Sequence, residues 1–512
     1  MSLADLPPEL LGSIAKSLAL DGPLAPFACI SKSWQYAVES LLFSSLRLTS
    51  EDLDFLDAYV ATSSSLRRSV LKSVDFTVVL PTYDRAACAR FEQEQDRQAN
   101  NAVFSEAMQR LFAALKSCDE VEQPGPMRLG LPAPYSPGDA GHRKSEKDNP
   151  GYLGDRRYEQ SYLALLAGET LPELQRIRSF AVFAATPRYV EPSAAVALAI
   201  KMPGLEKVMW QLWDGERMVP KLRKRLRLDL ASALLSATSA LKMLKDVEFK
   251  LQHEGPCNES FTNADVSGDS TDIGVDQLSQ SLKKLLQTSS LVNISLQGPI
   301  CIGRHLFDGD LESGATDTWP NLQEFRMSFS IVRPDGGWYF ERDPSAPSWQ
   351  SDDDEEPHHG GWSESTGSDL EDSESFEEAD SDELQRLDIY DENKASRLQG
   401  FEPAHYFRTQ PNEHLSLLLK AMAQSVLRMP SLRIFAAGAD IQPCPRTDYN
   451  PQTFEFEYAV LGTTNWKDQT SADEGSDRLY WTVPTGWRMG ETLEKSWRRV
   501  LDEDGIVRYE EW

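Results

Sequence analysis

The residue types that carry most enzyme chemistry are present in this chain, but not at the spacing that such chemistry needs. The sequence has no glycine-rich phosphate-binding pattern, no HExxH zinc pattern and no GxSxG nucleophile pattern. His358 and His359 are adjacent, but they lie in an acidic stretch without a scaffold to fix coordination geometry. Aspartate and glutamate are so numerous that no pair stands out as an acid and a base. We therefore expect no catalytic residue, no metal site and no cofactor.

A basic run is the other feature that could do chemistry. It reads Lys221-Leu222-Arg223-Lys224-Arg225-Leu226-Arg227. The simplest interpretation is a solvated face of a helix that continues through residues 230–241. A nuclear-import signal and a docking site for an acidic segment are the alternatives.

The charge of the chain limits its partners. The 512 residues include 52 basic and 80 acidic side chains, a formal net charge of −28. This charge argues against nucleic acid and against anionic membrane surfaces as partners. Residues 351–383 hold 15 acidic residues and no Lys or Arg. We predict a disordered acidic insertion over 343–396, because such a segment buries too little apolar surface to offset its ordering entropy.

Other stretches bear on order and location. The segment 122–156 is rich in Pro, Gly and polar residues, which predicts a flexible loop. No run approaches 18 apolar residues, no secretion signal is recognisable, and the six cysteines are scattered without a CxxC pair. We therefore expect reduced thiols and a cytoplasmic or nuclear location.

The first fifty residues predict three short helices. Leu10, Leu11, Ile14 and Leu18 share one helix face, and the segment 21–23, Asp-Gly-Pro, ends that helix. A short second helix follows around residues 24–28, and the spacing of Trp34, Val38 and Leu41 indicates a third. Helices of this size bury too little surface to be stable alone, so they need a partner or a neighbouring domain.

This stretch resembles an F-box. The resemblance depends on two motifs, Leu6-Pro7-Pro8-Glu9-Leu10-Leu11 and Ile30-Ser31-Lys32-Ser33-Trp34. The resemblance implies binding to a Skp-type adaptor, which bridges to a cullin and a RING ubiquitin ligase. By position, the implied adaptor-binding residues are Leu6, Pro7, Leu10, Leu11, Ile14, Leu18, Phe27, Ile30 and Trp34. The alternative is an N-terminal helical cap on a larger fold.

A pattern of one Leu followed by alternating apolar residues recurs along the rest of the chain. The pattern predicts strands, and apolar spacing between its copies predicts helices. Its anchors are Phe43, Leu71, Leu174, Leu205, Leu244, Leu291, Leu322 and Leu432. The alternation resembles the degenerate leucine-rich repeats of F-box proteins, and with the tail it is similar to a group found in filamentous fungi. An ordinary α/β sheet domain is the alternative.

We therefore predict an α/β chain with five parts. These are an F-box over 1–48, an irregular leucine-rich-repeat-like solenoid over 49–342, the acidic insertion over 343–396, a last repeat-like unit over 397–440, and a small α+β cap over 441–512. The cap is expected because repeat arrays need an atypical terminal unit.

The function that this resemblance implies is a substrate receptor of a Skp–cullin–F-box ubiquitin ligase. It is not an enzyme itself, and its target is an unidentified protein. The alternatives are an interaction scaffold outside ubiquitination and an enzyme with an unfamiliar site. In a curved repeat, outward side chains of the strands face the partner. The candidate target-binding residues are Lys207, Met209, Gln211, Glu248, Lys250, Asn293, Ser295, Arg326 and Ser328.

Overall fold

The computed structural model covers most of the chain. It describes residues 6–342 and 408–512, except for 21, 63–64, 85–86, 88–90, 120–124, 140–156, 159–160, 185–187, 216–218, 254, 257–258, 260, 269–274, 289, 310–317, 442–451, 464–474 and 502–503. The predicted acidic insertion over 343–396 lies outside the described residues. Among those described, no helix is both long and apolar enough to span a bilayer.

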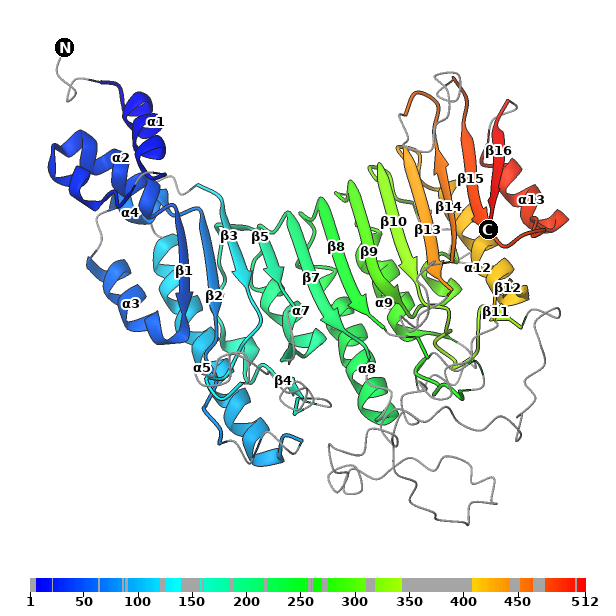
Figure 1. The fold of residues 1–512 in the computed structure, drawn as a ribbon, viewed down its shortest axis with the longest axis horizontal. Helices are drawn as coiled ribbons and strands as arrows, with labels where there is room; N and C mark the ends of the chain where they lie inside the picture. Colours follow the sequence, from blue (N-terminus) through cyan, green and yellow to red (C-terminus); the bar gives the residue numbers. More distant parts are fainter. Residues whose placement is uncertain are drawn as a thin grey trace, which may run out of the picture.

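The body is built on one sheet of 12 strands, and chain order and sheet order agree (Figure 1). Neighbours pair in parallel from β1 to β13, β14 is antiparallel to β13 and β15, and β16 is parallel to β15. The strands are β1 (Ser45–Thr49), β2 (Ser73–Thr77), β3 (Met127–Leu131), β5 (Ile177–Val182), β7 (Lys207–Trp213), β8 (Asp246–Gln252), β9 (Asn293–Ile300), β10 (Glu324–Phe329), β13 (Ile434–Asp440), β14 (Thr453–Ala459), β15 (Arg478–Val483) and β16 (Ile506–Glu511). The chain is therefore an α/β protein with a mixed, mostly parallel sheet.

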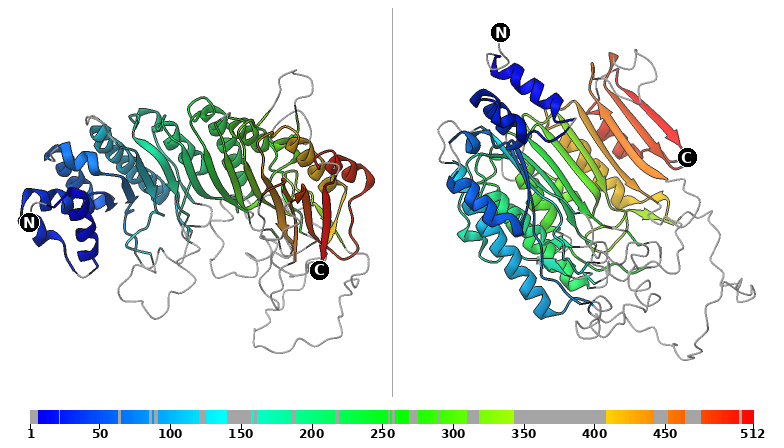
Figure 2. Two further views of the ribbon diagram at one scale, coloured as in Figure 1. Left: turned by 90° about the horizontal axis from the view of Figure 1, so that it is seen from above. Right: turned by 60° about the vertical axis from the view of Figure 1, so that its left-hand side comes forward.

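Helices cover one face of this sheet, and no helix among the described residues covers the other, as Figure 2 shows from above. The same view shows the sheet bending toward its bare side, which we call the open face. The covering helices are α5 (Glu94–Asp119), α7 (Pro192–Ile200), α8 (Pro220–Ala237), α9 (Gln277–Leu286), α12 (Glu413–Val426) and α13 (Glu491–Arg498). Near β1 lie α3 (Leu53–Thr62) and α4 (Ser65–Val70). Two small pairs, β4 (Tyr162–Leu163) with β6 (Tyr189–Val190) and β11 (Phe340–Glu341) with β12 (Gln410–Pro411), stand apart from the main sheet.

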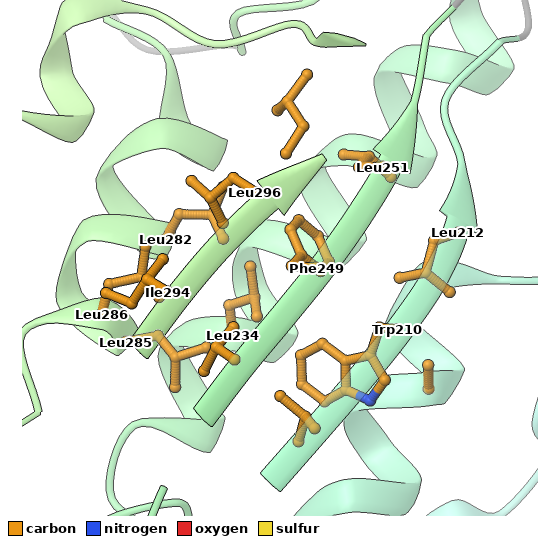
Figure 3. Packing of buried hydrophobic residues seen from close by; sticks show 14 of the residues in the cluster. Trp210, Leu212, Leu234, Phe249, Leu251, Leu282, Leu285, Leu286, Ile294 and Leu296 are labelled. Atoms are coloured by element: carbon orange, nitrogen blue, oxygen red, sulfur yellow. The ribbon is translucent and has the colours of Figure 1, made fainter. Parts of the chain in front are cut away.

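Alternation along the strands creates the core between sheet and helices. In β7 the side chains of Val208, Trp210 and Leu212 are buried, and the residues between them are more exposed. Side chains on one face of a strand recur every two residues, whereas side chains on one face of a helix recur every 3.6 residues. Figure 3 shows the core that these two faces form. The strand side chains Trp210, Phe249 and Ile294 point toward the helices, where they meet Leu234 of α8 and Leu282 of α9.

The predicted leucine anchors explain how several of the strands begin. Six Leu anchors are at most 1% exposed, and Leu432 is 6% exposed. Several close a short turn just before their strand, because their amide donates to a carbonyl three residues back. Examples are Leu205 to Met202 at 3.0 Å and Leu432 to Met429 at 3.1 Å. At these strands a buried Leu in a fixed turn sets the point where the strand begins.

One prediction from sequence needs correction. The segment 122–156 is not a loop throughout, because Met127–Leu131 forms β3 within the main sheet. Met127, Leu129 and Leu131 stand at every second position and are buried, which is typical of a strand. The Pro and Gly residues around them favoured the loop prediction instead. In the 441–512 region, where a cap is predicted, β14 pairs with β13 and thereby continues the main sheet.

The first helices form a separate small core. They are α1 (Pro8–Leu18), the 3-10 helix η2 (Ala25–Cys29) and α2 (Lys32–Leu42), and residues 6–43 are called the N-terminal module below. Its buried residues are Leu11, Ala15, Leu24, Trp34, Ala37 and Val38, a cluster distinct from that of the sheet. All three helices predicted from the sequence are therefore present.

Candidate interaction surfaces

The N-terminal module is held together by a few local devices. Pro7 precedes α1 and leaves its first turn without a clash, since proline is tolerated at a helix start. Ser31 caps α2, because its hydroxyl accepts a hydrogen bond from the Trp34 amide at 3.2 Å. The Trp34 ring stacks on Phe27 with centroids 6.0 Å apart. Trp34 is thus part of the interior that fixes the helices to one another.

The nine predicted adaptor-binding residues fall into different environments. Leu11 and Trp34 are 0% and 3% exposed, so they build the core. Leu10 and Ile30 are 51% and 57% exposed, which is high for large aliphatic side chains. Pro7 is exposed, and Leu6, Ile14, Leu18 and Phe27 pack partly buried against the core. Sequence reasoning missed three further exposed apolar residues, because Tyr36 and Leu42 lie off the periodic face of α2 and Leu20 follows the end of α1.

An ion pair joins this module to the body. The Arg67 guanidinium of α4 donates to both carboxylate oxygens of Glu39 in α2, at 2.9 and 2.6 Å. The same guanidinium lies 5.0 Å from the centre of the Phe43 ring, a cation–π distance. Hydrogen bonding from Arg67 holds the pKa of Glu39 below its ordinary value, although burial opposes the shift. This contact fixes how the module meets the first helices of the body.

All nine candidate target-binding residues lie on the open face, on four adjacent strands. Met209, Glu248, Ser295 and Arg326 occupy one row across β7, β8, β9 and β10. Gln211 pairs with Lys250 in the next row, and Lys207 and Asn293 both pair with Asp246. Ser328 pairs with Gly438 of β13. The predicted register is confirmed, and target binding stays a prediction.

Three of these residues border a hollow of about 370 Å³ on the open face. Its floor lies over β13, where the outward residues Ala436 and Gly438 have little or no side chain. Ser295, Arg326 and Ser328 stand on one side, and Glu455 and Glu457 of β14 stand on the other. We call this hollow the β13 groove. Sequence reasoning missed its second wall, although Glu455 and Glu457 alternate with buried Phe454, Phe456 and Tyr458.

The charges in the β13 groove are coupled. Arg326 donates from Nε to Glu324 Oε1 at 2.5 Å and from Nη1 to Glu457 Oε2 at 3.1 Å. Burial opposes its charge, but these two carboxylates raise the pKa of Arg326 above its ordinary value. The Glu457 side chain is only 6% exposed, so Arg326 compensates a buried charge. On the same wall, Thr482 Oγ1 donates to Glu455 Oε1 at 3.3 Å.

The basic run is not a solvated helix face, and that prediction is wrong for two of its arginines. Arg223 and Arg227 are buried and share the carboxylate of Asp214, at 2.9 and 2.6 Å. Burial disfavours the Asp214 charge, but the two guanidinium groups hold its pKa well below the usual range. Nuclear import and docking of an acidic segment would also need these arginines exposed. Lys221 and Arg225 remain at the surface.

Metal ligands do not gather anywhere in the part of the chain that the structure describes: no group of three or more His, Cys, Asp or Glu residues there could hold an ion. His358 and His359 lie outside that part. Comparison with known proteins finds no matching family model, no matching curated protein and no matching solved structure. The two surfaces therefore have to be interpreted from their own residues.

Proposed function

We propose that this chain is the substrate receptor of a cullin-RING ubiquitin ligase. In this proposal the N-terminal module is an F-box that binds a Skp-type adaptor. The body is an irregular leucine-rich-repeat-like solenoid, closed by an α+β cap that includes β14, β15, β16 and α13. The protein acts in the cytoplasm or nucleus, binds no cofactor and performs no reaction itself.

One observation carries the adaptor half of the proposal. Within the F-box-like motifs, Leu11 and Trp34 complete the module's core while Leu10 and Ile30 remain about half exposed. Burying a large aliphatic side chain stabilises an assembly by about 1.5–3 kcal/mol. Leu10 and Ile30 are large apolar side chains that lie outside the core and reduce solubility when exposed. Such side chains are suited to an interface, because interface cores are apolar and poor in charge.

The target half of the proposal rests on the open face. Helices cover the other face, so within the described part of the chain this is the face that offers strand side chains to a partner. Its candidate residues from Lys207 to Ser328 are mostly polar or charged, which suits a protein surface better than a small apolar ligand. The receptor would work by proximity, bringing target lysines close to a charged ubiquitin carrier.

Co-purification from cells tests the adaptor contact. The double variant Leu10→Ala and Ile30→Ala is predicted to lose the adaptor and the cullin, because each truncation removes exposed aliphatic surface without touching the module's core. The matched control is Leu235→Ala and Met243→Ala, which truncates two side chains that are 44% and 52% exposed on the body. The control should retain both partners. Equal recovery with both double variants would remove the F-box assignment.

Target turnover separates this function from a scaffold outside ubiquitination. A receptor predicts that proteins captured by the chain are degraded faster when Leu10 and Ile30 are intact. A scaffold predicts capture without any dependence of turnover on these two residues. Half-lives of captured proteins in cells carrying the double variant or the control would distinguish the two.

A further inference from the structure

The β13 groove has a shape that fits an extended chain. Neighbouring strands lie about 4.8 Å apart, so the walls on β10 and β14 stand roughly 9.6 Å from each other across β13. Ala436 and Gly438 leave the space between these walls empty. A Cβ on Gly438 would come within 2.8 Å of Glu455 Cβ, so the close approach of this wall depends on glycine. The floor is thus narrow and open to solvent.

The groove carries an excess of negative charge. Its lining includes one cation, Arg326, and three carboxylates, Asp440, Glu455 and Glu457. Arg326 already bonds Glu324 and Glu457, so it offers little to an incoming anion. Ser295, Gln297, Ser328 and Thr453 add neutral hydrogen-bonding groups. An anionic occupant would be repelled, and the acidic stretch 351–383 of this chain is disfavoured for the same reason.

The carboxylates are also spaced like the side chains of a strand. Glu457 is only 6% exposed and already bonds Arg326, so the wall presents Asp440 of β13 and Glu455 of β14 instead. These two residues are diagonal neighbours across the paired strands, which places their side chains about 7–8 Å apart. Alternate side chains of an extended peptide repeat at about 6.7 Å, which is close to this distance. A peptide lying along β13 could therefore place one side chain near each of these two carboxylates.

We propose that the β13 groove binds an extended segment of the target protein that carries arginine or lysine side chains two residues apart. This inference rests on the proposed function only in treating the open face as the target-binding face. The groove would supply charge complementarity and hydrogen bonds, and the floor over Ala436 and Gly438 would admit the peptide backbone.

Binding of a defined peptide by the purified full chain tests this proposal. The probe is a fluorescein-labelled Gly/Ser/Ala octapeptide with two arginines separated by one alanine, and its partner probe has citrulline in place of both arginines. The arginine peptide should bind with an affinity that falls as salt is added, since exposed charges are screened. Equal binding of the citrulline peptide would contradict recognition of a cation.

Two charge variants locate the binding site. Asp440→Asn with Glu455→Gln is expected to weaken the arginine peptide about three- to tenfold, because each exposed charge pair contributes modestly. Glu106→Gln with Glu413→Gln changes the net charge equally at exposed positions on α5 and α12, and it should stay within about twofold of wild type. Equal loss in both double variants would mean that the peptide senses overall charge, and the groove assignment would be wrong.

A third variant tests the groove without changing charge. Ala436→Leu projects a larger side chain from the open face into the floor, and it should weaken the peptide at least as much as the charge variant. Circular dichroism confirms that each variant is folded before binding is compared. Undiminished binding to a folded Ala436→Leu variant would overturn the proposal. The assay contains no adaptor, so its failure leaves the Leu10 and Ile30 test untouched, and the reverse also holds.

Discussion

Asp214 shows how one carboxylate can link several parts of the body. It lies just after β7 and accepts from Arg223 and Arg227 of α8. Arg227 also donates to the Cys301 carbonyl after β9 at 2.8 Å, and it lies 3.4 Å from Asp276, the cap of α9. These groups are buried, so each charge depends on its partners.

Asp214→Ala is predicted to lower the free energy of unfolding by about 3–5 kcal/mol, the usual effect of leaving buried charges without their partner. Urea titration at neutral pH measures this difference. The control is Asp229→Ala, an exposed position on α8, where the change should stay below about 0.5 kcal/mol. Similar losses in both variants would contradict a special role for the buried carboxylate.

The same residue predicts a pH dependence. The folded state holds the pKa of Asp214 below its unfolded value, so its contribution is complete above the unfolded value of about 3.9. The contribution is lost as the pH falls through the folded pKa. The stability difference between wild type and Asp214→Asn should therefore shrink on acidification below about pH 4. A difference that grows in acid would show that the assigned ion pairs are wrong.

At the scale of elements, the joint between α2 and α4 decides how firmly the N-terminal module is held. Arg67→Ala should lower the stability of the module by about 1 kcal/mol, since the pair is bidentate but Arg67 is partly exposed and screened. Thermolysin should then cleave within residues 6–43 several-fold faster. Because the pKa of Glu39 is depressed in the folded state, the effect should fade as the pH falls through that pKa.

A second exposed ion pair provides the control for the joint. Arg97 donates to Glu94 within α5 at 2.8 and 3.0 Å, so Arg97→Ala removes a comparable pair far from the module in the sequence. Its cleavage pattern over 6–43 should match wild type. An unchanged pattern with Arg67→Ala as well would mean that other contacts hold the module in place.

Elements were predictable where local period and burial agree. Leu278, Leu282, Leu285 and Leu286 mark α9 in the sequence, and all four are at most 1% exposed. Contacts between side chains that are far apart in the sequence were not predictable. The run around Arg223 resembles a solvated face because Asp214 and Asp276 are distant in sequence, and the β13 groove exists only because small residues of β13 fall between longer ones of β10 and β14.

The ion pairs of Arg326 also change one expectation about the open face. Charge reversal at Lys207 and Glu248 should leave the fold intact, since both side chains point away from the core between the sheet and the helices. The sequence alone suggests the same for Arg326. The structure predicts otherwise, because a glutamate there would face Glu324 and the buried Glu457.

At the scale of the whole molecule, the described residues on either side of the acidic stretch meet. Phe340 pairs with Pro411 and Glu341 with Gln410, so β11 and β12 bring the two flanks together. Replacing 343–396 by a short Gly/Ser linker should therefore leave the melting temperature within about 2 °C, since loop length alters closure entropy only slowly. A scanning calorimetry drop well beyond that would show that this segment contributes to the fold.

The central claim is that the two surfaces divide the work, with the N-terminal module binding the adaptor and the open face binding the target. Titration calorimetry of the purified full chain with a purified Skp-type adaptor tests this most directly. The account predicts one-to-one binding that weakens at least tenfold in Leu10→Ala with Ile30→Ala, and that persists in Lys207→Glu with Glu248→Lys on the open face. No binding by the wild-type chain, or equal loss in both double variants, would contradict it.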